Sequence, residues 1–168
     1  LKMGNGAHEG ITVGPLIDEK AATSVCEFID DATAKGAVVT LGGGRSDLGA
    51  CFVQPTILTD VNRSMRVFSE EIFGPVAPVF KFSSENEVIE MANDTEFGLA
   101  AYFYSRDIGR IYRVGEQLEY GIVGINEGIV SNEMAPFGGV KESGSGREGS
   151  KYGLDDYMEI KYICMGAI

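Results

Sequence analysis

Three cysteines and one histidine are the side chains best suited to nucleophilic or metal chemistry. The cysteines are Cys26, Cys51 and Cys164, and the histidine is His8. An odd number of cysteines at wide, irregular spacing matches neither a disulfide framework nor the paired ligands of a zinc site. A single histidine leaves almost no material for histidine-ligated metals or serine–histidine pairs. We therefore predict no metal site, and unpaired cysteines favour a reducing compartment.

A glycine-rich segment, residues 144–149 (GSGREG), reads literally as the G-x-G-x-x-G loop of dinucleotide-binding folds. In those folds the loop follows a buried strand, opens a helix and precedes an acidic residue about 20 positions further on. Residues 136–143 (PFGGVKES) are no buried strand, and only 19 residues follow Gly149. We therefore predict a tight loop in which glycines permit positive φ and close backbone approach.

The elements that must position functional residues alternate between helix and strand. Helices are expected at residues 18–35, 84–93 and 107–118, each opening on an aspartate or a serine that suits a helix start. Strands are expected at residues 37–41, 52–58, 76–82, 100–104 and 122–125, with Pro55 and Pro78 marking two of them as edges or irregular segments. This alternation predicts an α/β fold with a largely parallel sheet flanked by helices.

The C-terminal part of the chain has a different character. A short helix is expected at about residues 148–154, and the tail at residues 157–164 (YMEIKYIC) is rich in strand-forming residues. A strand that stands alone at a chain end needs a sheet edge to join. We predict that this edge belongs to another subunit.

The charge balance limits the classes of partner. The 168 residues carry a formal net charge of −11, and 44% of them are hydrophobic. An acidic surface repels phosphate backbones and disfavours anionic membranes. No apolar run approaches the roughly 20 residues of a membrane-spanning helix. We therefore expect neither nucleic acid nor a membrane as a partner.

Two segments resemble the aldehyde dehydrogenase superfamily. They are residues 70–76 (EEIFGPV) and residues 136–144 (PFGGVKESG), the latter continuing to Gly146, Arg147 and Glu148. The segments 2–15 (KMGNGAHEGITVGP), 54–56 (QPT) and 92–95 (ANDT) share the resemblance, which covers essentially the whole chain in order. Within the superfamily, residues 126–128 (NEG), Ser131 and residues 148–153 (EGSKYG) are most similar to succinate-semialdehyde dehydrogenases.

The resemblance implies a division of the chain by role. Residues 1–135 are expected to belong to the second part of the catalytic domain, and residues 136–156 to form a glycine-rich loop and a short helix. Residues 157–168 are expected to form an oligomerisation strand that joins a sheet shared between subunits. A homo-oligomer, either a dimer or a tetramer, is therefore implied.

The resemblance also assigns four binding residues. Glu71 corresponds to the glutamate that binds the nicotinamide ribose. A carboxylate suits this role, since it can accept hydrogen bonds from both hydroxyls of a vicinal diol. Phe73 corresponds to the aromatic residue bordering the nicotinamide ring, with Gly74 and Pro75 fixing the turn that presents the pair. The implied cofactor is NAD or NADP. Glu70, next to this pair, is expected to be structural.

Two further residues are assigned to the substrate. Ser131 corresponds to a serine that donates a hydrogen bond to the distal carboxylate of a semialdehyde, and Phe137 to an aromatic residue of the substrate tunnel. Asn126 is expected to order the adjoining loop. Lys141 and Arg147 are expected to be mainly structural, with a role at subunit contacts left open.

The implied reaction requires groups that this chain lacks. In the family, a cysteine thiolate attacks the aldehyde, hydride passes to the nicotinamide, and water hydrolyses the thioester with a glutamate as base. None of the three cysteines lies in the family's nucleophile motif. Because the chain opens on Leu1, inside a matched segment, we expect the nucleophile and base upstream and the chain alone to be inert.

Two hypotheses remain from the sequence. The first is the C-terminal part of an NAD(P)-dependent dehydrogenase that oxidises a short semialdehyde, with succinate semialdehyde giving succinate as the leading case. The second is a stand-alone, non-catalytic binding or subunit-contact module derived from the same family. A cytoplasmic location is expected, or the mitochondrial matrix in a eukaryote. The choice between NAD and NADP, the semialdehyde and the state of assembly stay open.

Overall fold

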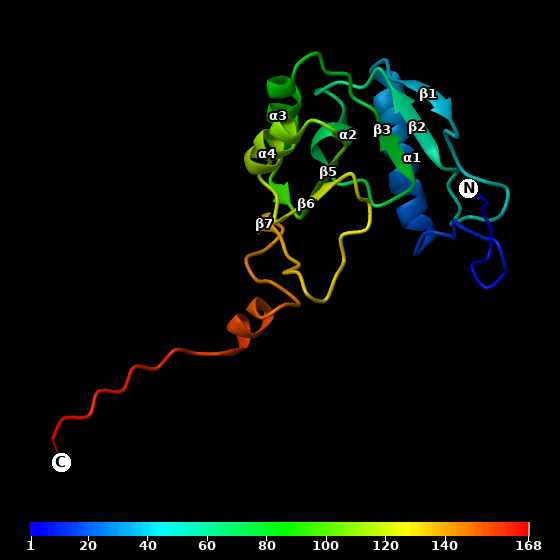
Figure 1. The fold of residues 1–168 in the computed structure, drawn as a ribbon. Helices are drawn as coiled ribbons and strands as arrows, with labels where there is room; N and C mark the ends of the chain where they lie inside the picture. Colours follow the sequence, from blue (N-terminus) through cyan, green and yellow to red (C-terminus); the bar gives the residue numbers. More distant parts are fainter. Residues whose placement is uncertain (168) are drawn as a thin grey trace. The chain divides into compact units, whose positions relative to one another are not determined.

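The computed structural model describes residues 1–167, and the chain divides into two units between Lys81 and Phe82. Unit 1 spans Leu1–Lys81 and runs from blue to green in Figure 1. Unit 2 begins at Phe82 and contains the rest of the described chain. This division follows packing within the chain. The division by role at residues 135 and 156 stays a prediction.

Unit 1 is a helix beside a small sheet. Helix α1 (Glu19–Ala34) is followed by the strands β1 (Val38–Leu41), β2 (Thr56–Thr59) and β3 (Val76–Pro78) in the order β1-β2-β3 (Figure 1). The helix begins where expected, because the Asp18 carboxylate accepts a hydrogen bond from the backbone N–H of Ala21 at 2.7 Å. It ends at Gly36, whose φ of 100° suits glycine.

The core of unit 1 joins one face of α1 to the sheet and to a short second helix. Phe28, Ile29 and Ala32 recur at helical spacing, are buried, and pack against Leu58 of β2. Met65, 1% exposed, belongs to the same core and immediately precedes α2 (Arg66–Ser69). The sequence pattern did not predict α2, because four residues without a capping side chain give no periodic signal.

Unit 2 contains two helices, two pairs of strands and a short 3₁₀ helix. In chain order these are α3 (Glu85–Asn93), β4 (Phe97–Gly98), β5 (Ala100–Phe103), α4 (Ile108–Gln117), β6 (Ile122–Ile125), β7 (Val140–Lys141) and η1 (Tyr152–Tyr157). Strand β5 pairs with β6 in parallel, and β4 pairs with β7 antiparallel. The helices α3 and α4 pack against each other (Figure 1).

Both helices of unit 2 begin at the predicted side chains. The Asp107 carboxylate accepts from the N–H of Arg110 at 2.7 Å, and the Ser84 hydroxyl accepts from the N–H of Glu87 at 3.2 Å. The Glu87 carboxylate in turn accepts from the N–H of Ser83 at 2.7 Å, one residue before the position of a standard capping box. The expected first residues of α3 and α4, which depend on hydrogen bonds between residues three positions apart, are thus confirmed.

The α/β class is confirmed, whereas one largely parallel sheet is not seen in the described residues. They form three small sheets, in which two strand pairings are parallel and two are antiparallel. The physical reason lies in the connections. Residues 42–55 join β1 to β2 without a helix, and the chain turns back on itself, whereas the connection between the parallel strands β2 and β3 contains the helix α2.

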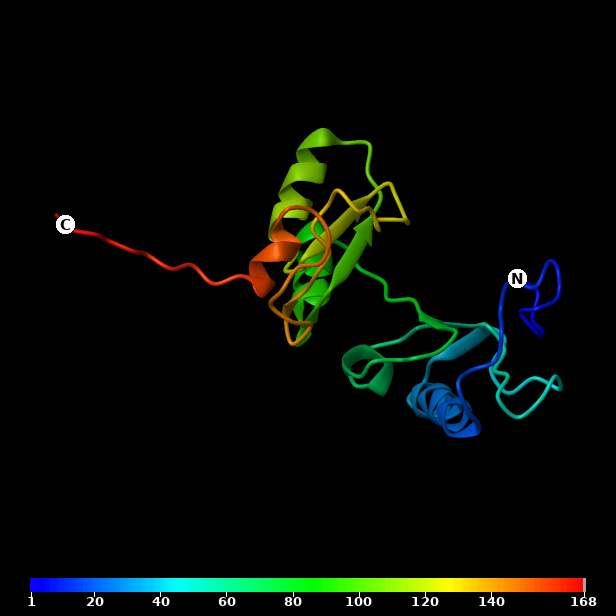
Figure 2. The ribbon, with the colours of Figure 1, turned by 90° about the horizontal axis from the view of Figure 1, so that it is seen from below.

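The predicted terminal strand is also absent from the described residues. Residue 157 ends η1 instead, and residues 158–167 form no strand. Figures 1 and 2 both show this tail running away from η1. Ile160 and Tyr162 are 102% and 85% exposed. A strand needs ladder hydrogen bonds to a neighbour, and this chain supplies none to the tail. The short helix expected at residues 148–154 lies later, at η1.

No helix in the described part of the chain is long and apolar enough to cross a membrane.

Candidate functional site

The loop after α2 presents Glu71 and Phe73, two exposed residues separated by one position in the sequence. Ile72, between them, packs against the core of unit 1, while both neighbours face solvent. Phe73 is 83% exposed. Covering an exposed aromatic ring with an apolar group is favourable, so the ring is available to contact a ligand. Glu71 and Phe73 therefore face solvent on either side of Ile72, whose packing against the core holds the centre of the loop.

Tight turns fix the far end of this loop. The N–H of Gly74 donates to the carbonyl of Ile72 at 2.9 Å, and the N–H of Val76 donates to the carbonyl of Gly74 at 2.9 Å. The N–H of Thr56 on β2 donates to the carbonyl of Pro75 at 2.8 Å. At Gly74 an added Cβ would collide with the side chain of Val25 on α1. The turn lies at Gly74 and Pro75, as expected, and the loop needs glycine at position 74 to lie against α1.

An ion pair fixes the near end of the loop. Arg66 donates from Nε and Nη2 to the two carboxylate oxygens of Glu70, at 2.8 and 2.9 Å. These hydrogen bonds from Arg66 hold the pKa of the Glu70 carboxyl below its usual value. Glu70 thus has a structural role, as predicted. Arg66 was not predicted to have a role. Its position four residues before Glu70 could have indicated one, because this is the spacing of an ion pair on a helix.

The chemistry of the projection suits a dihydroxy compound bearing a flat ring. An ionised carboxylate accepts hydrogen bonds only, so Glu71 matches the two hydroxyl donors of a vicinal diol. The Phe73 ring offers an exposed apolar face for a planar group. The two residues are separated by one position, so one ligand can contact both. A ribose linked to a nicotinamide ring has this combination of groups.

The predicted substrate residues lie in unit 2, after β6. Asn126 ends that strand with a φ of 57°, and its amide bridges the backbone of Ser105. The N–H of Ser105 donates to Asn126 Oδ1 at 2.9 Å, and Asn126 Nδ2 donates to the carbonyl of Ser105 at 2.8 Å. Asn126 therefore orders the start of the loop, as expected. Ser131 is exposed further along the same loop.

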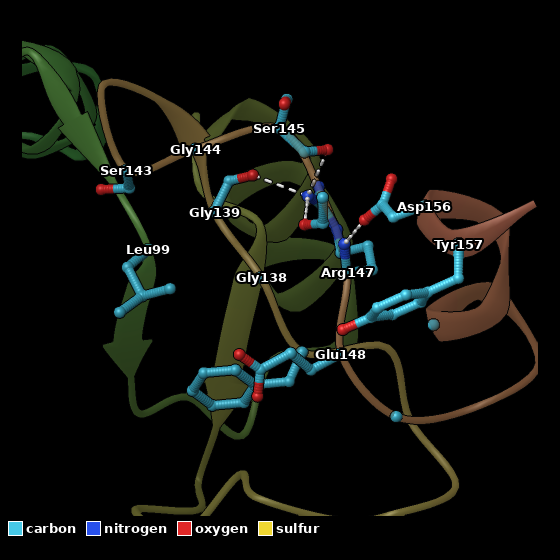
Figure 3. Close-up of a pocket in the computed structure, with 14 residues that line it drawn as sticks. Leu99, Gly138, Gly139, Ser143, Gly144, Ser145, Arg147, Glu148, Asp156 and Tyr157 are labelled. Carbon is cyan, nitrogen blue, oxygen red and sulfur yellow. Dashed lines mark hydrogen bonds between the residues drawn. The ribbon is translucent and has the colours of Figure 1, made fainter.

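Phe137 closes this loop against the glycine-rich segment. Its N–H donates to the carbonyl of Glu148 at 2.9 Å, and the N–H of Glu148 donates back at 2.7 Å. Phe137 is half-buried and lines a cavity of about 640 Å³ together with the glycine-rich segment (Figure 3). Ser131, in the same unit, does not line it.

Six of the fourteen residues that line the cavity are glycines, and Arg147 ties parts of the wall together. Arg147 Nη1 donates to the carbonyls of Gly139 and Gly146 at 2.7 and 2.8 Å, and Asp156 accepts from the Arg147 N–H at 3.3 Å (Figure 3). Gly144 and Gly149 have φ of 112° and 67°. The prediction of a tight glycine loop is confirmed, and Arg147 has the expected structural role. Because this arginine is committed to carbonyls, we interpret the cavity as part of the scaffold.

Lys141 is structural in the same way. Its ammonium donates to the carbonyls of Asn93 and Thr95 at 2.9 and 3.2 Å and pairs with the Glu119 carboxylate at 2.6 Å. These contacts join β7 to the end of α3 and to the segment before β6. The glycine loop is thereby fastened to the rest of unit 2.

The cysteines do not gather into a reactive centre. Cys26 packs beside the buried Val25 and Val53, which confirms its predicted packing role. Cys26, Cys51 and Cys164 are all free thiols. Within residues 1–167, no three side chains of histidine, cysteine, aspartate or glutamate are grouped so as to hold a metal ion.

Comparison with known proteins yields one family. The model of the aldehyde dehydrogenase family matches residues 1–163. The chain is 61% identical to a 3-sulfolactaldehyde dehydrogenase of Pseudomonas putida over 100% of its length, and 63% identical to a succinate-semialdehyde dehydrogenase [NADP(+)] of Escherichia coli over 99%. A crystal structure of an E. coli NADP-dependent enzyme superposes with a TM-score of 0.97 at 62% identity, covering 99% of the chain.

These relatives are much longer than the chain. It covers 35% of the P. putida protein, 34% of the E. coli dehydrogenase and 35% of the superposed crystal structure. The chain thus spans about a third of the length of the relatives that it matches.

Proposed function

The chain belongs to the aldehyde dehydrogenase family, and on that premise we propose that it is the C-terminal part of an NAD- or NADP-dependent dehydrogenase of short semialdehydes. The leading reaction is the oxidation of succinate semialdehyde to succinate. The observation that carries the proposal is the exposed pair Glu71 and Phe73, held out on a loop that is anchored at both ends.

In this proposal, the pair holds the nicotinamide half of the cofactor. Glu71 accepts hydrogen bonds from the two ribose hydroxyls, and Phe73 covers one side of the nicotinamide ring. The bound cofactor supplies an acceptor for the hydride that leaves the aldehyde carbon. The contribution of this chain is to orient the ribose and the ring, and to exclude water from one side of the ring.

The nucleophile and the base come from the rest of that protein. Reaction at an aldehyde by this route requires a cysteine thiolate that forms a thiohemiacetal, then a thioester that water hydrolyses. Cys26 is committed to core packing, and neither Cys51 nor Cys164 lies in the nucleophile motif of the family. We therefore expect the chain of 168 residues, purified alone, to reduce neither NAD+ nor NADP+.

The substrate is proposed to be a short aldehyde with a distal anion. Ser131 donates a hydrogen bond to the distal carboxylate, and Phe137 borders the substrate tunnel. The names of the relatives agree in chemistry, since succinate semialdehyde carries a carboxylate and 3-sulfolactaldehyde a sulfonate at the end opposite the aldehyde. A serine cannot neutralise such an anion, so cationic groups are expected from the rest of the protein.

The tail is proposed to join a neighbouring subunit. Its exposed apolar residues, including Ile160 and Tyr162, would gain burial and ladder hydrogen bonds as an added strand. A dimer or a tetramer follows from this. We also propose that strands from the rest of the protein extend the β5–β6 pair into a largely parallel sheet, since a pair of strands alone is marginally stable.

The test is an assay of the complete dehydrogenase that contains this sequence. Formation of reduced cofactor is followed with succinate semialdehyde, glutarate semialdehyde, 3-sulfolactaldehyde and butanal, the last lacking a distal anion. We expect turnover with the anionic aldehydes and a much higher KM for butanal. The absence of cofactor reduction with every aldehyde would contradict the proposal, as would turnover by the isolated chain.

A further inference from the structure

We propose that Arg66 is a positioning residue for cofactor binding, because it fixes the end of the loop from which Glu71 and Phe73 project. This inference rests on the function proposed above for those two residues. It adds a device outside the binding pair: Arg66 holds Glu70, and Glu70 is bonded directly to Glu71 in the chain.

The geometry of the pair is that of a rigid clamp. Two parallel hydrogen bonds, at 2.8 and 2.9 Å, join the flat guanidinium to both oxygens of the Glu70 carboxylate. The guanidinium carbon also lies 4.5 Å from the centre of the Phe28 ring on α1. Arg66 therefore cannot rotate without losing contacts on two sides, and Glu70 is held with it.

A second set of contacts ties the backbone of Arg66 to α1. The N–H of Arg66 donates to the Asp31 carboxylate at 2.9 Å. The same carboxylate pairs with Lys35 at 2.7 Å, and the Lys35 ammonium donates to the carbonyl of Ser64 at 2.8 Å. Asp31 has a lowered pKa because of its hydrogen bonds from Lys35 and then Arg66. These contacts fix the start of the short helix α2 against the C-terminal end of α1.

Only three residues, 71–73, lie between Glu70 and the second anchor of the loop. That anchor consists of the turn at Gly74 and the hydrogen bond from Thr56 to Pro75. Releasing one end of so short a segment increases the number of conformations available to Glu71 and Phe73 before binding. Ordering the loop on binding then costs conformational entropy, which weakens the cofactor complex selectively.

Charge acts in the same direction. Arg66 neutralises Glu70, so the binding pair has one anionic neighbour fewer. Without Arg66, an unpaired carboxylate would stand next to Glu71, where a cofactor that carries phosphates is proposed to bind. Both the loss of order in the loop and the added negative charge weaken binding of the cofactor, and neither changes binding of the aldehyde.

The experiment compares Arg66→Met with Lys81→Met in the complete dehydrogenase. Lys81 pairs with Asp60 at 2.8 Å, so each change replaces a cation by methionine and breaks one ion pair of unit 1. We expect Arg66→Met to raise KM for NAD(P)+ by about three- to tenfold, with KM for the aldehyde within about twofold of its original value. Arg66→Lys should recover part of the loss, because lysine keeps the charge without the fork. Lys81→Met should change neither KM.

A double-mutant cycle separates positioning from general stability. If Arg66 acts through the Glu71 loop, Arg66→Met should add less than about twofold to KM for the cofactor in a Glu71→Gln background. Additive effects, or an equal rise in both KM values, would overturn the inference. Should Arg66→Met not fold, Glu70→Gln breaks the same ion pair with little change of shape and leaves no unpaired carboxylate, so it should raise KM for the cofactor by less than Arg66→Met and leave KM for the aldehyde unchanged; an unchanged KM for the cofactor would then overturn the inference.

The two proposals fail differently. A Glu71→Gln variant with unchanged KM for the cofactor overturns the proposed role of Glu71 and this inference with it. A Glu71→Gln variant with raised KM, beside an unaffected Arg66→Met variant, overturns only the role of Arg66.

Discussion

Replacing Gly74 by alanine tests whether the cofactor loop must lie in direct contact with α1. A Cβ at this position would lie 3.2 Å from Cγ1 of Val25 and closer still to Cγ2, whereas ordinary contact begins at 3.4 Å. Val25 is 2% exposed and packs with Ala22 and Val53, so it cannot move aside freely. Overpacking of this kind costs about 1–3 kcal/mol. Because the φ of Gly74 is not positive, the cost is steric.

We expect the substitution to reduce both the thermal stability and the cofactor affinity of the complete dehydrogenase. Gly74→Ala should lower the thermal midpoint and raise KM for NAD(P)+, since the loop either strains the core or moves away from it. Gly14→Ala is the matched control, because an added Cβ there meets no atom within 4 Å. It should leave both quantities unchanged.

A second substitution shows whether the clash is the cause. Val25→Ala removes both methyl groups that the new Cβ would meet, at the cost of a small cavity of its own. In the double variant the penalties should therefore be less than additive, by about 1 kcal/mol or more. Strict additivity, or a Gly74→Ala variant as stable as the Gly14→Ala control, would refute the packing argument.

Three other outcomes are expected. Asn126→Ala should cost about 1–3 kcal/mol in thermal unfolding, because it removes both amide hydrogen bonds to Ser105 and leaves alanine at positive φ; an Asn126→Ala variant as stable as the parent would contradict this. Glu85 has a pKa held below 4.5 by hydrogen bonds from Arg113 and then Arg110, so its contribution is present above pH 4.5 and is lost as pH falls through the lowered pKa. A Glu85→Gln variant should therefore show a shallower fall of the thermal midpoint in acid, and an unchanged slope would count against the ion pairs. Ser131→Ala should raise KM for succinate semialdehyde about three- to tenfold and leave KM for butanal unchanged, and an equal effect on both aldehydes would exclude a role in binding the distal carboxylate.

Local signals in the sequence were sufficient for the helix starts. Asp18, Ser84 and Asp107 each accept a hydrogen bond from an N–H three residues later, so the information lies within one helical turn. The apolar spacing of α1 likewise identified the face that meets the core. These features depend on neighbouring residues and need no knowledge of distant contacts.

Elements made by distant contacts were missed. The two-residue strands β4 and β7 exist because residues 97–98 pair with residues 140–141, and neither segment has a periodic pattern of its own. Helix α2 is similarly short, and its first N–H is bound by Asp31 from α1. The described residues form three small sheets in place of one largely parallel sheet, because strand direction is set by the paths of the connections.

The candidate site shows the same division. Glu71 and Phe73 could be singled out from the sequence because the motif EEIFGPV resembles a family in which those positions have roles. The sequence did not reveal that Ile72 turns inward between them, that Gly74 must lie against Val25, or that Arg66 holds Glu70. Each of these facts joins the loop to α1 or to the core around it.

The sequence by itself thus determined which residue types are present, where helices begin and to which family the chain is similar. The tertiary structure alone decided which strands pair, that Gly74 lies against Val25 and that Arg66 holds Glu70. The physical reason is range: capping and periodicity act over three or four residues, whereas packing and ion pairing depend on residues brought together from distant parts of the chain. The tail of residues 157–164 is the clearest case, since its composition favours a strand and only a neighbouring sheet edge can make it one.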